Sequence, residues 1–137
     1  MTKQKLVVNV SAVIVHHGCV LMIKQPSSPK KDAWMMPSTA LHLGESLQQA
    51  IDREVPALTG ITVEAGPPLY NRDFFIYDKE GNVERHFMVI DIEADYVKGI
   101  PKSSSDDTQV AWVSAPAMDL MEIDGGARTV LEYIEFL

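Results

Sequence analysis

Alternating apolar and polar positions predict strands over most of the chain. Apolar runs at Leu6–Val15 and Cys19–Lys24 are joined by His16-His17-Gly18, which indicates a hairpin. Further strands are expected at 61–78, as strand, turn and strand, at 83–95 after a tight connection over 79–82, and at 109–114.

One amphipathic helix is predicted in the middle of the chain. Ser46 and Gln49 have the spacing of a capping box, and Gly60 supplies a stop signal. Pro56 lies near the end of this helix and removes the amide that would bond the carbonyl of Asp52. The apolar stripe of the helix comprises Leu47, Ala50, Ile51, Val55 and Leu58.

Polar loops are expected at 25–33, where proline and serine gather, and at 98–108. Two helical pieces then end the chain. The order of mixed strands, one central helix, more strands and a C-terminal helix predicts an α/β fold with a mixed sheet packed between helices. The buried stripe of the last helix is expected to be Val130, Leu131, Ile134 and Leu137.

Length and composition narrow the class of protein. The 137 residues suit one domain over 1–137, with 46% hydrophobic and 23% charged residues. No apolar run approaches the roughly 20 residues that span a bilayer, so no membrane partner is expected. A formal net charge of −7 argues against nucleic-acid binding. Cys19 alone makes no internal disulfide, which fits a cytoplasmic protein.

A pattern of charged residues surrounds the central helix. Glu45 is followed by seven residues and then by Arg-Glu-Val at 53–55, with Gly60 and Ile61 further on. This spacing resembles the signature of the Nudix (MutT-like) family, in which glycine, five residues, glutamate and seven residues precede R-E-U-x-E-E-x-G-U, where U is aliphatic. Trp34 and Pro37 match the W-x-x-P of the family.

The resemblance implies a Nudix-type α/β/α sandwich. It also implies hydrolysis of a nucleoside diphosphate linked to another group, with Mg²⁺ or Mn²⁺ as cofactor. The segments 84–95 and 104–114 resemble the branch of the family that cleaves ADP-ribose. The implied partner is a small nucleotide or sugar nucleotide, and a homodimer is left open.

Several positions depart from the signature. Thr39 and Ser38 stand where the family has glycines, and Ala57 and Leu58 replace both acids of the E-E pair. Positions three or four apart share one face of a helix, so Glu54 and the residue at position 58 should point at one ion. Leucine has no ligand atom. The substitutions therefore predict that catalysis at this motif is weakened or lost.

The candidate catalytic residues are carboxylates and one arginine. By resemblance, Glu54 is the remaining metal ligand, and Glu45 is a second metal candidate that supports the motif together with Arg53. Asp106 and Asp107 lie in the loop where relatives often place a further catalytic acid. The plain alternative for Glu45, Asp106 and Asp107 is a solvated carboxylate.

Two residues are candidates for substrate binding. Lys24 ends a strand where relatives often hold a cation near the phosphates, and Trp34 precedes a loop where it would stack on a base. An exposed lysine and a packed tryptophan are the alternatives. Asp91, Glu93 and Asp95 alternate on one strand face and are expected to be exposed to solvent.

Three functional hypotheses follow. The first is a Nudix-family protein with weakened or lost catalysis, and the second is an active metal-dependent pyrophosphohydrolase of ADP-ribose or sugar-nucleotide type that uses other acidic ligands. The third is a non-catalytic module that binds nucleotides. Binding of metal and turnover of ADP-ribose would distinguish them.

Overall fold

The computed structural model describes residues 5–26 and 32–137. Its elements are β1 (Lys5–Val13), β2 (Val15–His16), β3 (Cys19–Lys24), β4 (Ser38–Ala40), α1 (Leu47–Thr59), β5 (Ile61–Tyr77), β6 (Val83–Gly99), β7 (Gln109–Ser114), α2 (Ala115–Met118) and α3 (Gly125–Tyr133). Most of the loop expected at 25–33 lies outside the described residues. No helix in the described part of the chain is long and apolar enough to cross a bilayer.

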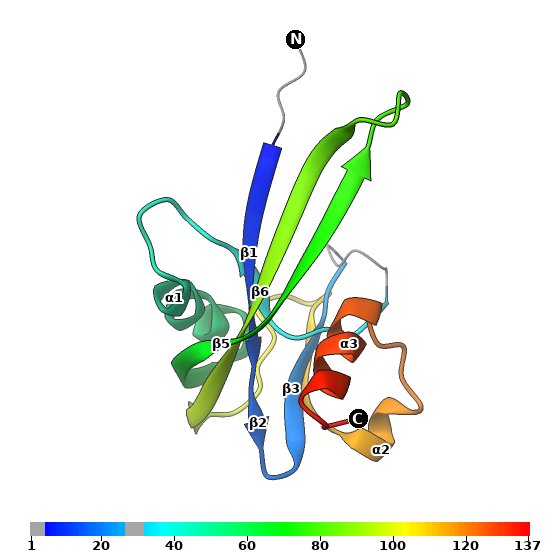
Figure 1. Ribbon diagram of the computed structural model, residues 1–137. Coiled ribbons are helices and arrows are strands. Elements are labelled where there is room, and N and C mark those ends of the chain that lie inside the picture. The colour runs from blue at the N-terminus through cyan, green and yellow to red at the C-terminus, as the bar shows by residue number, and fades with distance from the viewer. Residues whose placement is uncertain (1–4, 27–31) are drawn as a thin grey trace.

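Two sheets form the centre of the fold, with α1 on one side and α2 and α3 on the other (Figure 1). The first sheet has the order β4-β1-β6-β5, and the second has the order β2-β3-β7. β1 is parallel to β6, whereas β4 and β5 run antiparallel to their neighbours. The predicted mixed sheet between helices is therefore confirmed.

Alternation along β1 separates the two faces of the first sheet. Val10 and Ala12 pack in the same core as Ile51 and Val55 of α1. The odd-numbered residues point to the opposite face, because successive side chains of a strand alternate. Asn9 belongs to that second face, which α1 does not cover.

The predicted caps of α1 are present. Ser46 Oγ accepts from the Gln49 amide at 3.1 Å, and Gln49 Oε1 accepts from the Ser46 amide at 2.8 Å. Gly60 ends the helix in the left-handed conformation with φ of 76°. Pro56 lies inside the helix without ending it, since its lost bond falls in the last turns. Leu58 is only partly buried.

Two predictions about β5 and β6 are wrong. Residues 61–77 form one strand, in which register shifts around Pro68 replace the expected turn. Proline is tolerated here because β5 is an edge strand and needs no partner on its outer side. Asp91 pairs with Tyr70 just after the shifts and is fully buried, although Glu93 and Asp95 are exposed as expected.

Candidate functional site

Three charged side chains, one from the loop before α1 and two from its middle, form a cluster, called here the Arg53 cluster (Glu45, Arg53 and Glu54). Arg53 Nε donates to Glu45 Oε2 at 3.1 Å and Nη2 to Glu45 Oε1 at 2.9 Å. Its Nη1 donates to Glu54 Oε2 at 2.7 Å. Nη2 also reaches the carbonyl of Ala40 on β4 at 3.3 Å. The guanidinium therefore joins both carboxylates and ties α1 to β4.

The cluster does not fit a magnesium centre. Magnesium requires a near-octahedral shell of oxygen ligands. Glu54 is already paired with Arg53, and position 58, one turn later on the same helix face, holds Leu58. In the described part of the chain, no three His, Cys, Asp or Glu side chains gather closely enough to hold a metal ion. The side chains here form an ion-pair network.

Hydrogen bonds from Arg53, and a further one from the His42 amide, lower the pKa of Glu45 from 4.5 to about 2. The same pairing raises the pKa of Arg53. A carboxyl group with a lowered pKa stabilises the fold above pH 4.5, and this contribution is lost as the pH falls toward 2.

Between pH 4.5 and 2, we expect the melting temperature of Glu45→Gln to fall less with decreasing pH than that of the wild type. Thermal denaturation monitored by circular dichroism measures both slopes, and equal slopes would contradict the assigned pKa.

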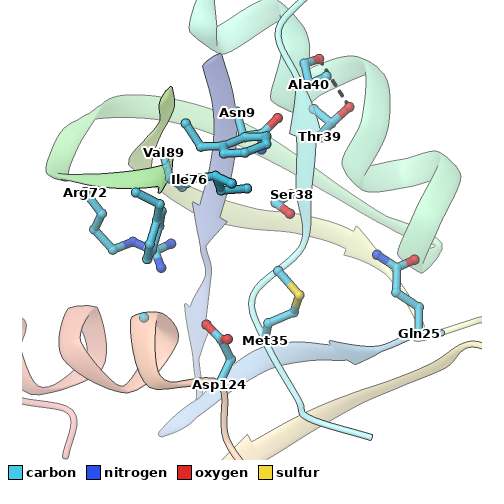
Figure 2. A pocket seen from close by; sticks show the side chains of 13 residues that line it. Asn9, Gln25, Met35, Ser38, Thr39, Ala40, Arg72, Ile76, Val89 and Asp124 are labelled. Atoms are coloured by element: carbon cyan, nitrogen blue, oxygen red, sulfur yellow. Dashed lines mark hydrogen bonds between the residues drawn. The ribbon is translucent and has the colours of Figure 1, made fainter. Parts of the chain in front are cut away.

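A cavity of about 590 Å³ lies on the second face of the first sheet, between the sheet and the start of α3. Figure 2 shows side chains from β1, β4, β5 and β6 around it. Three short polar or small residues of β4 line it, and Ala40 among them is the residue whose carbonyl contacts Arg53. The cavity therefore adjoins the Arg53 cluster across β4. Its lining consists of Asn9, Gln25, Met35, Ser38, Thr39, Ala40, Arg72, Phe74, Ile76, Phe87, Val89, Asp124 and Gly126.

The cavity has an apolar wall and one charged end. Phe74 and Phe87 lie opposite one another in the register of β5 and β6 and contribute aromatic surface. At the charged end, Arg72 Nε and Nη2 donate to the two oxygens of Asp91 at 3.0 and 2.8 Å. Asp124 lies at the N-terminus of α3, where its Oδ2 accepts from the amide of residue 127 at 3.1 Å. A flat ring with polar atoms along one edge matches this arrangement.

A family model described as the NUDIX domain matches residues 5–134. The chain belongs to the Nudix family. A crystal structure of a MutT NUDIX hydrolase from Burkholderia pseudomallei is 25% identical with a TM-score of 0.74, covering 93% of this chain and 96% of that one. No curated protein is similar enough in sequence to count as a match.

Two solved Nudix structures were determined with nucleotides. The NUDIX domain of Shewanella oneidensis NrtR, complexed with ADP ribose, is 16% identical with a TM-score of 0.69, covering 98% of this chain and 88% of that one. A bifunctional NMN adenylyltransferase/ADP ribose pyrophosphatase from Francisella tularensis, complexed with AMP and a Mn ion, is 18% identical with a TM-score of 0.66. The match covers 93% of this chain and 40% of that one. At these identities the likeness concerns the fold.

The fold brings together only some of the predicted residues of the Nudix site. Glu45, Arg53 and Glu54 form one cluster. Asp106 and Asp107 lie in an exposed loop, where Asp107 accepts from Ser105 Oγ at 2.7 Å. No hydrogen bond or ion pair joins either aspartate, both within the described range 32–137, to the Arg53 cluster.

The two residues predicted to bind substrate contact each other outside the lining of the cavity. Lys24 Nζ is 5.7 Å from the centre of the Trp34 ring, a cation–π contact. The backbone of Trp34 bonds to Glu122 and Asp124, which makes an isolated bridge to the segment before α3. Neither Lys24 nor Trp34 is among the residues that line the cavity.

Sequence reasoning missed the charged end of the cavity. Arg72 lies on β5, Asp91 on β6, and Asp124 and Gly126 at the start of α3, so only the tertiary fold joins them. One local signal was present. Asp124 followed by Gly125 and Gly126 has an N-cap residue before two glycines, an arrangement that exposes backbone at a helix start.

Proposed function

We propose that this Nudix-family protein binds a nucleoside diphosphate linked to another group and hydrolyses it weakly or not at all. The nucleoside part lies in the cavity on the second face of the first sheet. The diphosphate lies toward β4 and the Arg53 cluster. The observation that carries the proposal is the combination of a formed cavity with a motif glutamate that is held by arginine.

The cavity supports the binding part of the proposal. Its apolar wall, which includes Phe74, Phe87 and Val89, offers the aromatic and aliphatic surface on which a heterocycle packs. Asn9 and Ser38 add polar side chains toward β4. ADP ribose in the Shewanella NrtR complex is consistent with a ligand of this class.

The Arg53 cluster supports the catalytic part. Metal-assisted hydrolysis of a diphosphate needs an ion that neutralises the phosphate oxygens and holds the attacking water. Here the paired Glu54 is 26% exposed and bonded to Arg53, and Ala57 and Leu58 offer no ligand atoms. We therefore expect Mg²⁺ and Mn²⁺ to bind weakly, with Kd in the millimolar range or above, about 4 kcal/mol.

Calorimetry and a phosphate-release assay test the proposal together. We expect ADP-ribose, UDP-glucose or GDP-mannose to bind, and turnover with excess Mg²⁺ or Mn²⁺ to stay well below the ordinary enzyme rate of about 1 per second. Turnover in that ordinary range would contradict the proposal that catalysis is weakened or lost. Failure of all three nucleotides to bind would overturn the assignment of the cavity.

The second candidate is an active hydrolase that uses Asp106 and Asp107. It is favoured by one contact, in which the amide of Lys102 donates to the carbonyl of Thr59 at 2.8 Å and anchors the 100–108 loop to the end of α1. If turnover is found, Asp106→Asn with Asp107→Asn should abolish it under this candidate. Unchanged turnover in that variant would exclude these two acids.

A cytoplasmic location and a homodimer complete the proposal. Cys19 is free and partly buried, which is compatible with a reducing compartment. Phe75 and Tyr77 expose aromatic surface on the outer part of the β5–β6 hairpin, where a second copy would pack. Sedimentation of the purified chain measures its oligomeric state.

A further inference from the structure

We propose that Arg72 is the specificity-determining residue of the cavity, and that Asp91 and Gly126 are the residues that position it. Arg72 donates a hydrogen bond to an acceptor on the edge of the ligand's ring. Asp124 accepts a hydrogen bond from a neighbouring donor on the same edge. This inference rests on the proposed binding of a nucleotide derivative in the cavity.

The first support is the way in which the guanidinium is held. Arg72 is 12% exposed and Asp91 is 0% exposed, and two hydrogen bonds of 3.0 and 2.8 Å join them side by side. Such a two-bond pairing fixes both the position and the plane of the guanidinium. Nε and Nη2 are used in this way. Nη1 has no hydrogen-bond partner among residues 5–26 and 32–137, and Arg72 lines the cavity.

The second support is the space that Gly126 leaves. A Cβ atom at Gly126 would collide with Arg72 Nη1, and it would lie 3.2 Å from Asp124 Oδ2 and 3.4 Å from Arg72 Cζ. The guanidinium thus rests against bare backbone in the first turn of α3. A Cβ atom at the neighbouring Gly125 would have no other atom within 4 Å. Only one of the two adjacent glycines is therefore required by Arg72.

The third support concerns the kind of ligand group. Figure 2 shows the Asp124 carboxylate pointing from the start of α3 toward the end of the cavity that holds the Arg72 guanidinium. No ion pair joins these two described side chains, and Asp124 Oδ1 has no partner in the described part of the chain. One cation and two carboxylates, Asp91 and Asp124, give this end a formal charge of −1.

That charge disfavours a phosphate or carboxylate group at this end, because like charges repel in a partly buried site. An uncharged ring edge that carries an acceptor beside an N–H donor would provide hydrogen-bond partners for both Arg72 Nη1 and Asp124 Oδ1. The acceptor faces Arg72 Nη1, and the N–H faces Asp124. Nucleobases carry such edges.

The test compares the wild type with four variants of the full chain, which are the three described next and a combination of the first two. Arg72→Met combined with Asp91→Leu removes the pair without leaving a buried charge, a change that folded proteins tolerate well. Gly126→Ala disturbs Arg72 by collision, and Gly125→Ala is its matched control. Calorimetry measures Kd for ADP-ribose, UDP-glucose, GDP-mannose and inorganic pyrophosphate, and thermal denaturation measures stability.

We expect the best-bound nucleotide to lose about 10- to 100-fold in affinity in the double variant and in Gly126→Ala, the range of one lost charge-assisted hydrogen bond. Gly125→Ala should stay within about twofold of the wild type. Adding Gly126→Ala to the double variant should have little further effect, because the collision with Arg72 Nη1 is gone and only the 3.2 Å contact with Asp124 Oδ2 remains. Affinity for pyrophosphate should not change in any variant.

The outcomes separate this inference from the proposed function. If nucleotides bind the wild type and the stable double variant equally well, Arg72 does not read the ligand and only the inference fails. A parallel loss of pyrophosphate affinity would place Arg72 at the phosphates and overturn the ring-edge assignment. If no nucleotide binds the wild type, the proposed function fails, and the ligand role of Arg72 fails with it.

Stability gives a readout that needs no ligand. Alanine is the better helix former, so Gly125→Ala should raise the melting temperature. Gly126→Ala should lower it, and the decrease should become much smaller in the Arg72→Met, Asp91→Leu background, where only the 3.2 Å contact with Asp124 Oδ2 remains. A decrease of undiminished size there would show that Gly126 is required by a part of the fold other than Arg72, which would overturn its positioning role.

Discussion

Arg72→Met alone is expected to lower the free energy of unfolding by about 3–5 kcal/mol. Asp91 is 0% exposed, and both of its carboxylate oxygens accept from Arg72. Removing the arginine leaves a buried carboxylate without a counter-charge or donors, which is far more costly than losing an exposed pair. Urea denaturation at neutral pH, fitted to a two-state transition, measures the loss.

A change at Asp91, the partner of Arg72, provides the control for this prediction. Adding Asp91→Leu should recover most of the lost stability, because it removes the unpaired charge and adds apolar surface to the interior. Arg85→Met is the matched arginine change, since Arg85 lies on the same hairpin and is exposed. It should alter stability by no more than about 0.5 kcal/mol. A loss below about 1 kcal/mol for Arg72→Met would contradict the burial of Asp91.

The features predicted correctly are those that local sequence determines. Ser46 and Gln49 bond to each other's backbone over one helical turn, and Gly60 supplies the left-handed residue that ends α1. These interactions involve residues close in sequence, so they are visible without a fold. The spacing of Glu45, Arg53 and Glu54 likewise predicts their proximity, because they belong to one helix and the loop before it.

The buried end of the cavity was beyond local reasoning. Alternation assigns Asp91, Glu93 and Asp95 to one face, yet only Asp91 is buried, and it is paired with Arg72, whose guanidinium lies against Gly126 in the first turn of α3. Its partner Arg72 comes from a strand whose register shifts at Pro68. Neither the shift nor the position of α3 follows from the periodicity of either strand. The pairing of Arg72 and Asp91 is a property of the tertiary fold.

Restoring carboxylates in the last turns of α1 should create a metal-dependent gain in stability. The variant combines Pro56→Lys, Ala57→Glu and Leu58→Glu. α1 continues to Thr59 and Leu58 is only partly buried, so a carboxylate at position 58 should lie one turn after Glu54, within reach of the same ion. Without metal, added negative charge beside Glu54 should lower the melting temperature. With Mn²⁺ at about 100 times Kd, linkage predicts a gain of about 2.7 kcal/mol.

Differential scanning fluorimetry with and without Mn²⁺ measures the effect, with the wild type and the triple variant carrying Glu54→Gln as controls. Neither control should be stabilised by the ion, because the wild type lacks the added carboxylates and the second control lacks the carboxylate of Glu54. Equal stabilisation of the wild type would reveal metal ligands other than those of α1. If the triple variant folds but gains nothing from Mn²⁺, positions 54, 57 and 58 do not face a common ion. The absence of acids at 57 and 58 would then have no bearing on metal binding, and the predicted loss of catalysis would need another cause.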